Sequence, residues 1–246
     1  MQSIYQEVTD ASEIRQTLEK IVEMYNQGKL ASEKLSIFLF EYMIQHLARI
    51  SRVINKPAQG HSLLIGLGGN GRKTVTKLGA FVNDALIFRI EPSKTYGTPE
   101  WQEDLRNLFK LLGLENKKVI FLLQDSDLRQ EQFIEDVNNL LNVGELTNLF
   151  GEEDLEEINY EIEDQLKKLK AKGQPFEIFI QRCKRNLHIV LLMSPAGRYL
   201  EQIMRKYPSL VNCTSIDWFL NWPNEALLAV SDFYLTQNEQ LIEGFA

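Results

Sequence analysis

The sequence predicts an α/β fold, in which a central parallel sheet of five strands is flanked by helices. Two observations lead to this prediction. Short runs of consecutive apolar residues alternate with longer stretches in which apolar residues recur at helical spacing. A strand that is apolar along its whole length has to be covered on both faces, which is typical of parallel sheets. In such sheets the ligand site lies beyond the carboxyl ends of the strands.

The composition is that of a soluble globular protein. The chain has 246 residues, of which 44% are hydrophobic and 25% are charged, enough for one sizeable domain. Its 27 basic and 34 acidic residues give a net charge of −7, which argues against a nucleic-acid or anionic-membrane partner. Because no apolar run approaches the ~20 residues of a membrane helix, we expect a soluble, intracellular protein.

A helical lead-in is expected before the first strand. Apolar residues recur at helical spacing over residues 11–27 and again over residues 33–54, and the sequence KPAQG then breaks the chain. We therefore expect a lead-in over residues 1–58 and an α/β core over residues 59–222.

Strands and helices then alternate through the predicted core. We expect strands within residues 61–67, 85–92, 117–127, 187–195 and 210–219. We expect helices over residues 74–84, 98–113, 128–144, 151–173 and 175–186, and one in the second half of residues 194–208. A last helix over residues 225–235 would begin a C-terminal helical segment, residues 223–246.

A glycine-rich stretch, GLGGNGRKT, follows the first predicted strand. Gly66 and Gly71 have the spacing of a phosphate-binding loop, but Arg72 stands where Lys is usual and Lys73 where Ser or Thr is usual. Glycines allow backbone N–H groups to surround an anion, and the following helix adds partial positive charge. The strand–loop–helix context therefore favours phosphate binding over a simple turn.

The third predicted strand ends in acids, as VIFLLQDSD. Asp125 is in the place of an acid that holds Mg²⁺, usually through water, at the edge of a neighbouring strand. Ser126 follows where hydrolytic sites carry Glu, and a serine cannot act as a base near neutral pH. For Asp127 two interpretations remain: it shares the side of Asp125, or it is the N-cap of the next helix.

The other reactive residue types form no constellation. We interpret His46, His61 and His188 as structural, because they pair with no nucleophile motif. Cys183 and Cys213 are too few for a disulfide framework, and we expect both to be small buried hydrophobes. Taken alone, Ser194 would be a turn residue before a proline.

The order of glycine loop, acid strand and serine strand resembles an AAA+ P-loop NTPase core. The stretches KTYGTPEWQEDLRNLFKLLGLENKKVIFLLQDSDL, FIEDVNNLLNVGELTNLF and NLHIVLLMSPAG narrow the resemblance. With YPSLVNCTSIDWFLNWP, they are similar to the fourth AAA module of dynein heavy chains, most closely the axonemal type. The resemblance runs from about residue 20 to about residue 235, nearly the whole chain.

The resemblance also implies roles for the loop residues. Axonemal versions of the module commonly have the loop GxGGSG, then Lys or Arg, Gln and Ser. The positions that match this pattern outright, or by an accepted variant, are Gly66, Gly68, Gly69, Gly71, Arg72 and Thr74. Asn70 replaces the Ser and Lys73 replaces the Gln, and both are expected to bind the nucleotide with the others.

Three residues outside the loop take further roles by the same resemblance. Asp125 matches the Walker B acid, so that Thr74 and Asp125 are the expected Mg²⁺ ligands. Ser194 is where ring ATPases place a polar residue that contacts the γ-phosphate or the attacking water. Arg198 and Arg205 lie near where some ring ATPases present an arginine to a neighbour, although we expect surface cations.

The resemblance implies a regulatory module that binds ATP or ADP with Mg²⁺ and hydrolyses it poorly or not at all. Neighbouring AAA+ modules of a dynein ring would be its partners, and it would meet other dynein subunits and the microtubule only through the full heavy chain. The implied location is the cytoskeleton of the cilium axoneme, with the residues after 223 as the start of an incomplete lid. Two alternatives remain: a weakly active ATPase that uses Asp127, and a nucleotide-free structural module.

Overall fold

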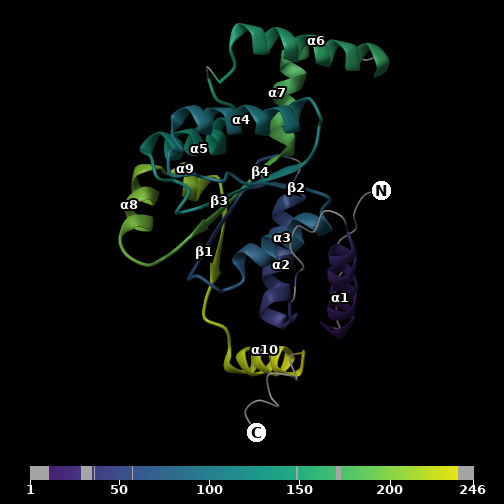
Figure 1. Ribbon diagram of the computed structural model, residues 1–246, viewed down its shortest axis with the longest axis vertical. Coiled ribbons are helices and arrows are strands. Elements are labelled where there is room, and N and C mark those ends of the chain that lie inside the picture. Colours follow the sequence, from purple (N-terminus) through teal and green to yellow (C-terminus); the bar gives the residue numbers. More distant parts are fainter. Residues whose placement is uncertain are drawn as a thin grey trace.

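The computed structural model describes residues 11–28, 35, 37–56, 58–147, 149–169 and 173–237. These residues form one parallel sheet with helices on both faces (Figure 1). The strands are β1 (Ser62–Gly66), β2 (Leu86–Phe88), β3 (Val119–Gln124), β4 (Leu187–Met193) and β5 (Ser215–Phe219). Their order across the sheet is β2-β3-β4-β1-β5, and every pair is parallel. The predicted five-stranded parallel sheet is therefore confirmed.

Two hydrophobic cores lie on the two faces of the sheet. Successive residues of β1, such as Leu63 and Leu64, belong to opposite cores because strand side chains alternate. One core packs against α4 (Thr98–Gly113), α5 (Glu131–Val143), α6 (Glu152–Leu169), α7 (Pro175–Asn186), α8 (Tyr199–Lys206) and α9 (Ser209–Asn212). The other packs against α1 (Ala11–Gln27), α2 (Glu41–Ile54), α3 (Arg72–Val82) and α10 (Asn224–Gln237).

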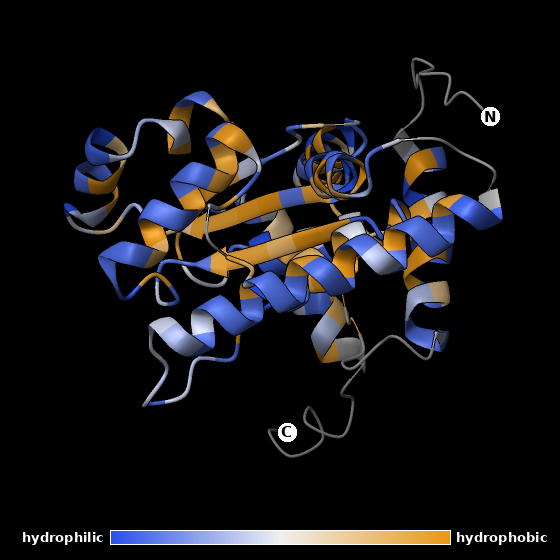
Figure 2. Cartoon of the chain, turned by 90° about the horizontal axis from the view of Figure 1, so that it is seen from above, coloured by the Kyte–Doolittle hydropathy of each residue, from blue (hydrophilic) through white to orange (hydrophobic). Residues whose placement is uncertain are grey.

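Hydropathy follows this layered arrangement. The central strands are apolar along their length, whereas the helices are apolar on one side and polar on the other (Figure 2). Within the described ranges, no helix is long and apolar enough to cross a membrane. The lead-in helices α1 and α2 share their core with α3 and the sheet, and the domain boundaries after residues 58 and 222 remain predictions.

The predicted helix over residues 33–54 was too long at its start. Helix α2 begins at Glu41, and residues 37–40 are not helical; positions 33, 34 and 36 lie outside the described residues. The Asn26 side chain accepts from the backbone N–H of Leu35 (2.7 Å) and donates to its carbonyl (2.9 Å). Phe38 then packs on the ring of Phe233. These tertiary contacts favour a non-helical backbone at residues 37–40, although their apolar residues have helical spacing.

Three other element boundaries also differ from the prediction. Strand β2 covers only Leu86–Phe88 of the predicted residues 85–92. The predicted strand over residues 210–219 starts as helix α9, because backbone bonds to the Pro208 carbonyl close a helical turn there. Helix α5 begins at Glu131 rather than at residue 128, after an extended N-cap residue.

Candidate functional site

The glycine loop joins β1 to α3 at the carboxyl edge of the sheet. Gly69 and Gly71 have φ angles of 86° and 83°, a left-handed conformation that L side chains rarely adopt. A Cβ atom on Gly68 or Gly69 would meet no heavy atom of the described structure within 4 Å. On Gly66 it would lie 2.8 Å from Phe219 on β5. The loop is thus open on its outer side and tightly packed where it leaves the strand.

The start of α3 is a favourable place for an anion. The first N–H groups of any helix have no acceptor within the helix, and they carry the positive end of the helix dipole. The N-cap residue, Gly71, has no side chain that could cap this end, and no acidic residue lies in the first turn. An anion at the loop would complete these hydrogen bonds.

Arg72 lies at the position of the usual phosphate-binding lysine. Its guanidinium donates to the backbone carbonyls of Leu64 (3.3 Å), Leu67 (3.2 Å) and Met193 (2.6 Å). Burial lowers the pKa of Arg72, and the nearby charge of Asp125 opposes that shift. The guanidinium therefore joins the ends of β1 and β4 and the first residue of the loop.

Asn70 ties the tip of the loop to the end of β5. Its Nδ2 donates to the carbonyls of Phe219 (3.1 Å) and Leu220 (3.3 Å). The indole N–H of Trp222 donates to the Asn70 carbonyl (3.4 Å). Asn70 was expected to bind the nucleotide together with the other loop residues; in this structure its side chain bonds the end of β5 and so positions the loop.

Lys73 and Thr74 are the second and third residues of α3, and both are half-buried. Among the described residues there is no group of three or more His, Cys, Asp or Glu that could hold a metal ion.

Asp125 and Ser194 meet at the same edge of the sheet. The Asp125 carboxylate accepts from the backbone N–H of Ser126 (2.9 Å) and of Ser194 (3.2 Å). The Ser194 hydroxyl accepts from the Ala196 N–H (3.2 Å). The acid was expected on a strand next to the loop strand, but β4 lies between β3 and β1. Arg72 links the loop to this intervening strand, because it donates to the carbonyl of Met193, the residue before Ser194.

Asp127 is not the helix N-cap that one interpretation proposed, because α5 begins at Glu131 with Gln130 as its N-cap. Its carboxylate belongs to a residue that is 6% exposed, and it accepts from the backbone N–H of Gln124 (2.9 Å) and the hydroxyl of Ser126 (3.4 Å). Asp127 therefore closes the turn after β3.

The two acids also line different cavities. Asp127 lines one of about 790 Å³ with Lys77 and Arg89. Asp125 lines another, of about 550 Å³, with Arg129 and Tyr199.

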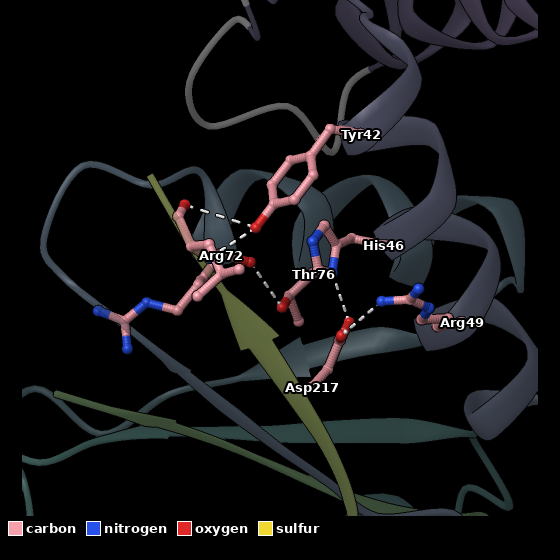
Figure 3. A network of polar contacts seen from close by, with 7 residues as sticks. Tyr42, His46, Arg49, Arg72, Thr76 and Asp217 are labelled. Atoms are coloured by element: carbon pink, nitrogen blue, oxygen red, sulfur yellow. Dashed lines mark hydrogen bonds and ion pairs between the residues drawn. The ribbon is translucent and has the colours of Figure 1, made fainter. Parts of the chain in front are cut away.

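The sequence interpretation missed a cluster of polar side chains that joins α2 to β5. His46 and Arg49 of α2 both contact Asp217 of β5, at 2.6 and 3.0 Å (Figure 3). Tyr42 of the same helix bonds the backbone of Leu220. These residues are about 170 positions apart in the chain, so the spacing His46–Arg49 on one helix face was the only local signal.

The remaining residues have structural surroundings. His61 accepts from the Ile189 N–H, and Nδ1 of His188 bonds the Gly60 carbonyl. Cys183 is a buried free thiol, as expected, whereas Cys213 is half-buried. Arg205 is an exposed cation paired with Glu201.

Comparison with known proteins agrees with this geometry. The family described as P-loop containing dynein motor region D4 matches residues 35–244. The chain is 37% identical to dynein axonemal heavy chain 6 of Homo sapiens, over 98% of this chain and 6% of that protein. It is 37% identical to the mouse dynein axonemal heavy chains 1 and 2, over 98% and 94% of this chain and 6% and 5% of those proteins. The chain thus spans about 6% of the length of these relatives, and it belongs to the family of the D4 AAA region of dynein heavy chains.

Proposed function

We propose that this chain binds ATP or ADP with Mg²⁺ as a regulatory AAA+ module of an axonemal-type dynein heavy chain, with little or no hydrolysis. The observation that carries the proposal is the open glycine loop between β1 and α3. Gly69 and Gly71 have left-handed φ angles there, and the loop leads into a helix whose N-cap residue, Gly71, has no side chain to cap it. Backbone donors arranged in this way are suited to phosphate oxygens.

We assign a role in the proposed site to the backbone of the loop and to each of the predicted site side chains. The N–H groups of residues 68–74 would surround the phosphates, and Arg72 and Lys73 would neutralise their charge. Thr74 and Asp125 would hold Mg²⁺, which screens phosphate charge when it is bound. Ser194 would contact the terminal phosphate, since its N–H bond to Asp125 keeps the two residues together.

Binding without efficient cleavage is supported by the turn after β3. Ser126 occupies the place of the usual general base, and loss of such a base costs roughly 10²–10⁴-fold in rate. Asp127 is a poor substitute, because its carboxylate holds the turn and lines a different cavity from Asp125.

The wider role is inferred from the relatives. Their names are those of axonemal dynein heavy chains, of which this chain matches a small part. We therefore propose that the module acts within a dynein ring in the cilium axoneme, with adjacent AAA+ modules as neighbours. Other dynein subunits and the microtubule would be reached only through the full heavy chain.

Calorimetric titration of the 246-residue chain with Mg-ATP and Mg-ADP tests the proposal. We expect saturable binding, a ligand-dependent rise in melting temperature, and phosphate release close to background. Absence of binding and of any melting shift would contradict the proposal and leave a nucleotide-free structural module. Phosphate release that disappears in Asp127→Ala while binding persists would instead support a weakly active ATPase.

A further inference from the structure

Four residues join helix α2 to strand β5: Tyr42, His46, Arg49 and Asp217, here called the Asp217 cluster. Nδ1 of His46 lies 2.6 Å from one carboxylate oxygen of Asp217, and the Arg49 guanidinium donates to the other at 3.0 Å (Figure 3). Asp217 is 8% exposed and His46 is 1% exposed. Burial alone would raise the pKa of Asp217, but the bonds and charges of His46 and Arg49 outweigh it, so that its pKa is lowered.

The cluster continues to the end of β5 through aromatic contacts. The His46 ring stacks on Phe219, with ring centroids 3.9 Å apart, and Tyr42 meets His46 edge-on at 4.3 Å. The Tyr42 hydroxyl accepts from the N–H of Leu220 (2.6 Å) and donates to its carbonyl (3.4 Å). Consecutive turns of one helix therefore hold the last residues of β5.

The same end of β5 also holds the glycine loop. The Leu220 carbonyl that accepts from Tyr42 also accepts from the Asn70 side chain (3.3 Å), and the Phe219 carbonyl accepts from Asn70 as well (3.1 Å). Gly66 approaches Phe219 so closely that a Cβ atom there would lie 2.8 Å from it. A movement of α2 would be passed through residues 219 and 220 to the loop.

We propose that the Asp217 cluster positions the phosphate-binding loop, so that the placement of helix α2 sets the nucleotide affinity of the module. This inference rests on the nucleotide site proposed above. None of the four residues lies in the loop, and the guanidinium of Arg72 points away from them (Figure 3). They act as positioning residues through Phe219, Leu220 and Asn70.

The variant Tyr42→Phe tests this link with little change in packing, because it keeps the ring and removes the hydroxyl that bonds Leu220. We expect the affinity for Mg-ADP to fall about fivefold, the effect of losing roughly one net hydrogen bond. Without ligand, we expect faster hydrogen exchange at the backbone amides of residues 67–71, while the amides of β3 and β4 keep their protection.

Tyr96→Phe is the matched control, since it removes a hydroxyl bonded to Asp104 at 2.5 Å, outside the loop and β5. It should change neither Mg-ADP affinity nor exchange in the loop. Arg49→Gln is a second variant at a side chain that is 56% exposed, so it should fold. It should give effects in the same direction as Tyr42→Phe.

The outcomes separate the two proposals. If the unmodified chain binds no nucleotide, the proposed function fails, while loop exchange in Tyr42→Phe still decides this inference. If Tyr42→Phe and Arg49→Gln both match the unmodified chain in Mg-ADP affinity and in loop exchange, the cluster is only part of the packing and the inference is wrong.

Discussion

The glycine loop and the turn after β3 follow buried parallel strands at one edge of the sheet, yet they use their polar groups in opposite ways. In the loop, Gly69 has a φ of 86°, and a Cβ atom added to it would meet no described heavy atom within 4 Å, so its surroundings are open. In the turn, the carboxylates of Asp125 and Asp127 accept backbone N–H groups of the protein itself.

This difference explains what each segment can offer to a ligand. The loop presents backbone donors, so an anion can bind without displacing an internal partner. In the turn, each oxygen of the Asp125 carboxylate already accepts one backbone N–H, from Ser126 or Ser194, so a metal ion there would use the remaining lone pairs. Arg72 likewise uses three of its five N–H donors on backbone carbonyls of the protein itself.

The largest expected effect comes from Arg72, whose side chain joins the end of β1 and the loop to the end of β4. Arg72→Met keeps the aliphatic stem but leaves the carbonyls of Leu64, Leu67 and Met193 without their donor. We expect the free energy of unfolding in urea to fall by about 2 kcal/mol, together with at least a tenfold loss of Mg-ADP affinity. Arg72→Lys should lose less affinity than Arg72→Met, because it keeps the charge although it lacks the planar fork of donors. Equal affinity for Arg72→Met and the unmodified chain would show that Arg72 is only a structural tie.

The next effect tests whether the loop depends on its left-handed backbone. Gly69→Ala places a Cβ atom in open space but at a φ of 86°, so strain alone should lower the free energy of unfolding by about 1–2 kcal/mol. Gly68→Ala is the matched control, since its neighbourhood is equally open and its φ is not positive. We expect it to change stability by less than about 0.5 kcal/mol. Similar losses in both variants, measured by urea unfolding, would contradict this account.

A smaller effect should separate the two acids of the turn. Asp127→Asn weakens the bond to the Gln124 N–H, and we expect about 1 kcal/mol of lost stability with unchanged Mg-ADP affinity. Asp125→Asn should reduce the dependence of ADP affinity on Mg²⁺ and change stability less. Calorimetry with and without Mg²⁺ gives the comparison, and a loss of the Mg²⁺ effect in Asp127→Asn alone would reverse the assignment.

The last prediction concerns His61, which precedes β1 at the amino-terminal edge of the sheet. Its protonation at low pH should lower the free energy of unfolding without changing the glycine loop. Burial, and to a lesser extent the charge of His188, lower the pKa of His61 to about 4, against about 6.5 in the unfolded chain. The unfolded chain therefore takes up the proton first, and stability is lost as the pH falls from 6.5 towards 4. We expect His61 to contribute a loss of about 1 kcal/mol between pH 7 and pH 5.5 in urea unfolding, and His188, whose pKa burial also lowers, to add to it.

The variant His61→Asn provides the control for this prediction. Its side-chain oxygen can still accept from the Ile189 N–H, but it does not titrate. The pH dependence of the free energy of unfolding should become shallower in this variant. An unchanged slope would assign the dependence to other groups.

Most of the sheet could be predicted because its strands are buried on both faces. The apolar runs around Leu64, Phe121 and Val190 have no polar alternation, which is typical of strands in a parallel sheet that is covered on both faces. The errors lie where a distant contact decides the local conformation. Residues 37–40 look helical in sequence, but Asn26 and the ring of Phe233 hold the segment around them in a non-helical path.

In the candidate site, too, some features could be predicted from the sequence and others depended on tertiary contacts. The sequence alone indicated the glycine loop, because glycine readily adopts the left-handed φ angles that Gly69 and Gly71 have. It also determined that Asp125 ends a strand at the ligand edge. Only the tertiary structure decided that β4 separates this acid from the loop.

Tertiary structure also decided that the Asp127 carboxylate closes its own turn and that Asp217 meets His46 across the chain. The physical reason is that backbone conformation and apolar periodicity are local properties of a chain. The partner of a buried polar group is selected by how distant helices and strands pack, and a single sequence carries no direct record of that selection.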